Sequence, residues 1–228
     1  MLLANLIHKQ DAMYSNASPR ARRGASPPTK RNIIFAVDSS GSIKRSNYSR
    51  TLQILGTFSQ LFCGYISVGM VSFSTHIELE LCPTCLGNTN QTTYRQDIVN
   101  KITSARYHGR LTSTGETVKC LADHILSSPD CRVLNKPTQV VFFTDGKHNG
   151  CLNTREQMEA LVKKYPTLET YAIGMGHDIK SSGVAELQGP NDPFSIFNVK
   201  DVDELERLMN VILGLIYNGN LACAPLVG

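Results

Sequence analysis

The sequence predicts an α/β fold, with a doubly wound, mostly parallel central sheet, one antiparallel edge strand and helices on both faces. Apolar, strand-like runs alternate with amphipathic, helix-like segments from residue 32 to residue 217. Two of these runs end in aspartates, Asp38 and Asp145. Carboxyl ends of parallel strands meet along one edge of a sheet, so we expect one site there.

Length, composition and charge indicate one domain between two tails. The chain has 228 residues and 18% charged residues, typical of a single globular domain. We expect a disordered basic tail over 1–31, the domain over 32–217 and a C-terminal tail over 218–228. The first tail carries six of the 23 basic residues and one of the 19 acidic ones. The rest is nearly neutral, which gives no reason to expect nucleic-acid binding.

The first residues give little sign of targeting. Residues 1–7 are apolar, but they are few and lack a positively charged lead, so they make a poor signal peptide. Arg20-Ala21-Arg22-Arg23 resembles a furin-type processing site, although a solvated basic linker explains it equally well. No apolar run is long enough to span a membrane.

The first half of the domain begins with a buried strand that ends at Asp38. The apolar residues of Ser46–Phe62 fall on one stripe, which predicts a helix. Ile66–Phe73 is a second apolar strand. Ile77–Leu81 alternates strictly between apolar and polar, as a half-exposed strand does, and a turn short enough for a hairpin precedes it. This strand is therefore expected at the antiparallel edge.

The middle of the chain is expected to hold two helices. A polar insertion over 82–93 precedes a modest amphipathic helix over Asp97–Ala105. Gly109–Gly115 reads as a loop. Glu116–Leu126 carries apolar residues at helical spacing and predicts a helix that faces the core.

The second half repeats the alternation. Val140–Phe143 forms the strand that ends at Asp145, and Thr154 with Gln157 has the spacing of a capping box for the next helix. Four more elements are expected: a strand over Leu168–Met175, a short helix over Val184–Leu187, a weak strand over Phe194–Val199, and a last helix capped by Asp201 with Glu204.

Oxygen-bearing side chains gather where the first strand ends. Asp38, Ser40 and Ser42 follow each other at alternate positions, and Asp145 stands at the end of another strand. Carboxylate and hydroxyl oxygens suit a hard cation such as Mg²⁺. The sequence therefore predicts a metal site at the carboxyl edge of the sheet.

Asp38-x-Ser40-x-Ser42 resembles the first part of the metal-ion-dependent adhesion site of the von Willebrand factor type A domain. The second part, a threonine in a loop before a helix, is matched by Thr112. The third, the aspartate of a Thr-Asp-Gly strand end, is matched by Asp145. The resemblance covers about residues 32–217 and implies the Rossmann-like fold of that family.

The resemblance implies that Asp38, Ser40, Ser42, Thr112 and Asp145 surround one divalent cation, some of them through water. Neutral hydroxyls keep the negative charge low, so an open metal position can accept a carboxylate from a partner protein. In the high-affinity state of the family, the threonine contacts the metal directly and the last aspartate lies behind the direct ligands. We expect Mg²⁺, although the ligand types also admit Mn²⁺ or Ca²⁺.

Four neighbouring residues are expected to form the rim that meets the ligand: Gly41, Arg110, Lys147 and His148. Gly41 would allow the tight turn between the two serines. His148 would tune partner choice or its pH response, unless it is merely solvated.

Within the family, Thr144–Asn149 looks most like the complement factor B and C2 type, whose strand end also runs Thr-Asp-Gly-x-His-Asn. Residues 197–205 resemble the last strand and helix of that subgroup. The chain departs from it in having no serine protease domain and no complement-control repeats. Similar modules occur in multidomain matrix proteins.

The chain has seven cysteines, so at least one is free or paired with another chain if the rest oxidise. Cys151 and Cys223 are the first candidates. Cys82-Pro83-Thr84-Cys85 favours a structural disulfide, either local or to another cysteine. Cys120 and Cys131 flank a helix and its exit, and could pair if the chain turns back.

Two glycosylation sequons begin at Asn47 and Asn90, and they matter only if the chain is exported. Three functions remain open. The favoured one is an extracellular, secreted adhesion or matrix module that captures an acidic residue of a protein ligand. A structural matrix protein that self-assembles or cross-links into homo-oligomers is the alternative. A metal-dependent hydrolase is least favoured, because no triad motif or nucleophile elbow is present, and we expect no enzyme.

Overall fold

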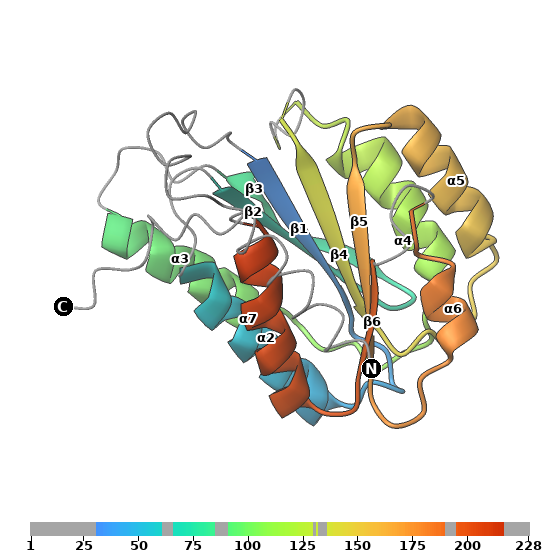
Figure 1. Ribbon diagram of the computed structural model, residues 1–228, viewed down its shortest axis with the longest axis horizontal. Helices are drawn as coiled ribbons and strands as arrows, with labels where there is room; N and C mark the ends of the chain where they lie inside the picture. Colours follow the sequence, from blue (N-terminus) through green and yellow to red (C-terminus); the bar gives the residue numbers. More distant parts are fainter. Residues whose placement is uncertain are drawn as a thin grey trace, which may run out of the picture.

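A six-stranded sheet forms the centre of the molecule (Figure 1). The computed structural model describes residues 31–60, 66–84, 91–129, 131, 136–189 and 195–216. The strands lie in the order β3-β2-β1-β4-β5-β6, and only β3 runs antiparallel. Their bounds are β1 Arg31–Asp38, β2 Ile66–Phe73, β3 Ile77–Thr84, β4 Thr138–Thr144, β5 Glu169–Met175 and β6 Ile196–Val199.

Helices cover both faces of the sheet (Figure 1). One face packs against α2 (Arg45–Gln60), α3 (Gln91–Thr103) and α7 (Val202–Ile216). The other packs against α4 (Thr114–Cys120), its π-helical continuation η2 (Leu121–Ile125), α5 (Thr154–Lys164) and α6 (Ser181–Ala185). The predicted fold class is confirmed.

β1 is buried on both sides, as its continuous apolar run requires. Ile33, Phe35 and Val37 point into the core under α2, whereas Ile34 and Ala36 point into the core under α4. The strand pairs in parallel with β2 and with β4. The chain therefore leaves β1 toward one half of the sheet and later builds the other half from β4, so loops diverge at the carboxyl end of β1.

Two predicted boundaries in the first half were wrong. β3 continues to Thr84, which pairs with Val68 of β2, so Cys82 lies in a strand and not in a polar insertion. Pairing along the edge outweighs the polar composition there. α3 begins at Gln91 and not at the predicted Asp97. The prediction missed its first turns because they are polar and carry no apolar period.

Helix starts also differ from prediction. α4 begins at Thr114, two residues before Glu116. The predicted capping box of α5 is wrong: the Asn153 side chain caps it by accepting the N–H of Glu156 at 3.1 Å. α6 spans Ser181–Ala185, earlier than the predicted Val184–Leu187.

The cap of α7 is as predicted. Asp201 Oδ1 accepts the N–H of Glu204 at 2.8 Å, and Glu204 Oε2 accepts the N–H of Lys200 at 2.8 Å.

Cys82 and Cys131 form a disulfide between β3 and the segment after η2. Of the pairings that the sequence left open, Cys82 thus joins another cysteine and Cys120 does not pair with Cys131: Cys120 is a half-buried free thiol and Cys151 an exposed one. Asn47 is exposed in the first turn of α2. The other cysteines, Asn90 and the candidate processing site lie outside the described residues. No helix in the described ranges is long and apolar enough to cross a membrane.

Candidate metal centre

Asp38 is the most buried carboxylate of the predicted site, at 0% exposure. Its Oδ1 accepts the N–H of Ser40 at 2.8 Å, and its Oδ2 accepts the Thr144 hydroxyl of the adjacent strand β4 at 2.7 Å. Burial raises the pKa of Asp38 to about 7; hydrogen bonds from Ser40 and Thr144 oppose this rise, and the nearby charge of Asp145 adds to it. The carboxylate thus lacks compensating positive charge.

The loop after β1 holds the two serines close together, with Ser40 Oγ 3.1 Å from Ser42 Oγ. Backbone hydrogen bonds tie this loop to the next: Gly41 N–H donates to Arg110 O and Gly109 N–H to Ser39 O, each at 2.8 Å. Gly41 has no positive φ. Its role is close approach, because a Cβ there would lie 3.2 Å from the Gly109 carbonyl oxygen.

Thr112 is buried at the end of the second loop. Its carbonyl oxygen accepts the N–H of Asn149 at 2.8 Å, and the next residue, Ser113, donates its N–H to Ser74 O at 2.9 Å. The loop that follows β4 and the turn that follows β2 therefore fix the position of Thr112.

Asp145 directly follows β4 and is 4% exposed. Its Oδ1 accepts the N–H of Lys147 at 3.0 Å. Its buried Oδ2 has no hydrogen-bond partner among the described residues, and the Lys147 ammonium lies 3.6 Å away. Gly146 allows the turn that follows, with φ of 76° and no room for a Cβ beside Lys180 O.

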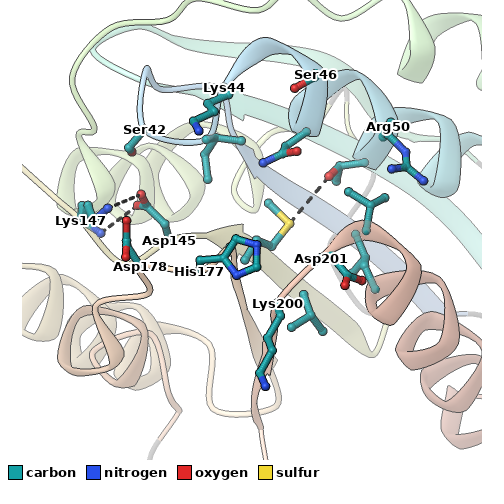
Figure 2. A pocket seen from close by; sticks show the side chains of 18 residues that line it. Ser42, Lys44, Ser46, Arg50, Asp145, Lys147, His177, Asp178, Lys200 and Asp201 are labelled. Carbon is teal, nitrogen blue, oxygen red and sulfur yellow. Dashed lines mark hydrogen bonds and ion pairs between the residues drawn. The ribbon is translucent and has the colours of Figure 1, made fainter.

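Two hollows meet at the site. A cleft lies between α2 and the loops that follow β5 and β6, with Ser42, Asp145 and Lys147 at one end (Figure 2). A more open groove lies on the other side and contains Thr112 with the predicted rim residues Gly41, Arg110, Lys147 and His148. Ser42 lines both hollows. The structure therefore brings the five predicted metal residues to one edge of the sheet.

The five predicted metal residues fit a hard divalent cation. Their side chains offer two buried carboxylates and three hydroxyls, and no nitrogen or sulfur. No cluster of three or more His, Cys, Asp or Glu exists in the described part of the chain, so a nitrogen- or sulfur-rich zinc site is not formed there. A cation here would offset the unfavourable burial of Asp38 and use the free oxygen of Asp145.

Ser42 Oγ contacts the Ser40 hydroxyl and not a histidine. His148 lies instead beside Glu186, with Nε2 3.4 Å from Oε2. This pair joins the loop that follows β4 to the region after α6. Ser42 therefore has no general base in the described residues of the kind that a serine nucleophile needs.

Sequence reasoning missed Glu116 as a supporting residue. Its Oε1 accepts the N–H groups of Cys151 and Leu152, at 2.6 and 3.1 Å, so α4 holds the loop that follows β4. An acidic residue in a first helical turn is ordinary, so its sequence position gave no signal of this contact. Tyr107 was also missed; its hydroxyl donates to Ser40 O at 3.2 Å.

Comparison with known families matches residues 32–211 to the von Willebrand factor type A domain. Among curated proteins, the human Collagen alpha-6(VI) chain is 26% identical over 183 residues, covering 78% of this chain and 7% of the collagen chain. The Collagen alpha-1(XXI) chain of Xenopus laevis is 25% identical over 207 residues, covering 89% of this chain and 20% of the collagen. The chain thus spans a small part of these relatives.

Among solved structures, proximal thread matrix protein 1 from the mussel byssus, with a zinc-occupied MIDAS motif, superposes with a TM-score of 0.67. It is 20% identical, and the match covers 88% of this chain and 50% of the mussel chain. BatB from Bacteroides thetaiotaomicron, a conserved hypothetical protein, gives a TM-score of 0.59 at 14% identity, over 81% of this chain and 98% of that one. At these identities the likeness shows the fold alone.

Proposed function

Because the chain belongs to the von Willebrand factor type A domain family, we propose that it is an extracellular binding module. A divalent cation, Mg²⁺ in the first place, is held by Asp38, Ser40, Ser42, Thr112 and Asp145. Its open coordination position captures an aspartate or glutamate of a protein partner.

One observation carries this proposal: two buried carboxylates share the edge with three neutral hydroxyls, and Asp38 forms no ion pair among the described residues. A buried carboxylate that has hydrogen bonds but no opposite charge beside it is unfavourable, so a structural role for Asp38 alone does not explain the arrangement. A divalent cation explains both carboxylates at once. Because three of its five ligands are neutral, the cation keeps enough charge to attract a further carboxylate.

The setting in the extracellular matrix is supported by the relatives, which are collagen chains and a mussel thread matrix protein. A binding role without catalysis agrees with a Ser42 hydroxyl whose partner is another serine. The Thr144–Asn149 stretch resembles the complement factor B and C2 type. A partner related to those of complement proteins would therefore be a more specific form of this proposal.

A pull-down from extracellular matrix extract tests the proposal. The wild-type chain should retain a partner in Mg²⁺ and release it in EDTA, and Asp38→Ala should retain none. Asp178→Ala is the matched control, because Asp178 lines the same cleft, is exposed and lies outside the predicted ligand set. Circular dichroism establishes that each variant is folded. A partner that stays bound in EDTA and on folded Asp38→Ala contradicts the proposal.

A second candidate function is covalent self-assembly in the matrix. The exposed free thiol of Cys151 favours it, since an exposed cysteine in an oxidising compartment readily pairs with another chain. Non-reducing electrophoresis of oxidised protein should then show dimers that Cys151→Ser abolishes. A monomer under these conditions contradicts this candidate.

A further inference from the structure

The groove on the Thr112 side of the site is basic. We call it the Arg110–Lys180 groove; it is lined by Gly41, Ser42, Thr75, residues 109–112, residues 147–149 and Lys180. Its charged residues are Arg110, Lys147 and Lys180, together with the titratable His148, and no Asp or Glu is among the lining residues. Ser42 and Thr112, two of the proposed metal ligands, are among its lining residues, so the groove adjoins the cation site.

Two of these cations are available to a ligand. Arg110 and Lys180 are exposed, and neither forms an ion pair within the described part of the chain. Lys147 and His148 already have acidic neighbours within the chain, Asp145 and Glu186 respectively. Opposite charges placed across an interface guide partner choice and orientation. The free charges of the groove therefore suit an acidic side chain.

Leu111 adds an apolar contact point at the same place. It is 61% exposed, and Leu79 is the other large hydrophobic side chain that is exposed among the described residues. Leu79 lies on the edge strand β3, whereas Leu111 immediately precedes Thr112 and lines the groove. A single exposed leucine is ordinary on a protein surface, but an apolar side chain ringed by polar groups beside a binding site is typical of an interface.

We propose that the Arg110–Lys180 groove receives a second acidic side chain from the partner segment whose first carboxylate is captured at the cation. An apolar side chain of that segment packs on Leu111. The partner is thus an extended protein segment that carries two acidic residues close together and one apolar residue near them. This inference rests on the proposed function, because the groove adjoins the cation site.

A sulfated polysaccharide is the competing occupant of a basic groove. Two observations favour the acidic peptide. A sulfated sugar has no apolar side chain to pack on Leu111, and the groove offers two free cations and not an extended basic strip. The metal site also binds carboxylates by its chemistry. The polysaccharide is therefore one of the outcomes that the experiment distinguishes.

The experiment titrates short synthetic peptides into the ¹⁵N-labelled chain at low salt in excess Mg²⁺, with binding followed by NMR. One peptide carries a single glutamate among Gly and Ser, and a series adds a second glutamate at increasing distance, with or without a leucine. We expect the best two-glutamate peptide to bind about threefold to tenfold tighter than the single-glutamate peptide, the gain from one or two exposed ion pairs. The leucine should add to this gain, and Leu111→Ser should remove what it adds.

Arg110→Gln with Lys180→Gln should abolish the gain from the second glutamate, measured as the ratio of the affinities of the two peptides for the same variant. Arg207→Gln with Lys163→Gln is the matched control, since both residues are exposed and neither lines the groove. Added salt should reduce the gain.

The outcomes separate the two proposals. A single-glutamate peptide that binds only in Mg²⁺, with no gain from a second glutamate at any distance, overturns the groove inference and leaves the proposed function standing. Peptide binding that EDTA does not affect overturns both, as does the failure of every peptide to bind. Heparin fragments that bind the groove without Mg²⁺, and more tightly than the best peptide, assign it to sulfated polysaccharides and overturn the inference.

Discussion

At the scale of single residues, the site depends on a conflict between burial and charge at Asp38. The carboxylate lies at the end of a buried strand and receives hydrogen bonds from Ser40 and Thr144, yet its pKa is raised to about 7. The unfolded chain has the ordinary value near 3.8. Ionising Asp38 in the folded, cation-free protein therefore costs on the order of 4 kcal/mol more than ionising it in the unfolded chain.

Asp38→Asn should stabilise the cation-free protein at neutral pH, because an amide keeps the shape of the side chain without the buried charge. The folded pKa lies above the unfolded one, so the free energy of unfolding of the cation-free wild type should fall as pH rises from about 4 to about 7 and then level off. Thermal denaturation in EDTA across this range measures both effects. The variant should lack this pH dependence and gain no stability from Mg²⁺. A variant that Mg²⁺ still stabilises would contradict the role given to Asp38.

Lys147→Gln should tighten cation binding about threefold. The ammonium of Lys147 lies 3.6 Å from Asp145 Oδ2 and competes with the metal for that charge, although its exposure to water keeps the effect small. Mg²⁺ titration by calorimetry measures the change. Lys200→Gln, from the same cleft, is the control and should leave the affinity unaltered. Weaker binding in Lys147→Gln would show that the lysine does not oppose the metal.

At the scale of elements, contacts between loops hold the site together. β1 and β4 supply the two aspartates, while Thr112 belongs to a loop held by Asn149 and Ser74. Glu116, on α4, grips the loop that follows β4 through two backbone N–H groups. The loop that contains Thr112 is thus bonded both to the loop after β1 and to the loop after β4, and a cation would join all three at one point.

Glu116→Gln should weaken this support. A carboxylate accepts two N–H groups more strongly than an amide oxygen does, so we expect a loss of about 1–2 kcal/mol in the free energy of unfolding. Mg²⁺ affinity should fall as well, because the same loop positions Thr112. Urea denaturation and calorimetry measure the two effects. Glu159→Gln, at an exposed position of α5, should change neither; equal effects in both variants would refute the role of Glu116.

Local patterns predicted most of these elements, because the apolar run of a buried strand and the apolar stripe of a helix are set by residues close together in the sequence. Asp38 and Asp145 were predictable as strand ends, and Thr112 through the order of the motif. The partner of Cys82, the loop contact of Glu116 and the extension of β3 depend on residues far apart in the sequence, which no local period reports. Asn153 replaced the predicted cap because two residues in succession were suitable, and only the path of the chain decides between them.

At the scale of the whole molecule, the Cys82–Cys131 disulfide and the candidate metal site lie toward different ends of the sheet. β3 begins beside Phe73, near the site, and reaches Cys82 toward the other end of the sheet, where the disulfide to Cys131 joins it to the second helical layer. The site itself contains no cysteine. Stability and cation binding should therefore respond separately to mutation.

Replacing Cys82 and Cys131 together by alanine should lower the free energy of unfolding by roughly 2–4 kcal/mol, since the disulfide closes a long loop in the unfolded chain. Denaturation curves measure this loss, and Mg²⁺ titration of the folded variant should give the wild-type affinity. A folded variant that has lost its affinity for Mg²⁺ would show that the two ends of the sheet are coupled.

The central claim is that one divalent cation is held by Asp38, Ser40, Ser42, Thr112 and Asp145. Anomalous diffraction at the manganese edge, from crystals grown with Mn²⁺, tests it most directly. We expect one strong anomalous peak among the hydroxyls of Ser40, Ser42 and Thr112, with both carboxylates close by. A peak that lies elsewhere, or an ordered site without any peak, would contradict it.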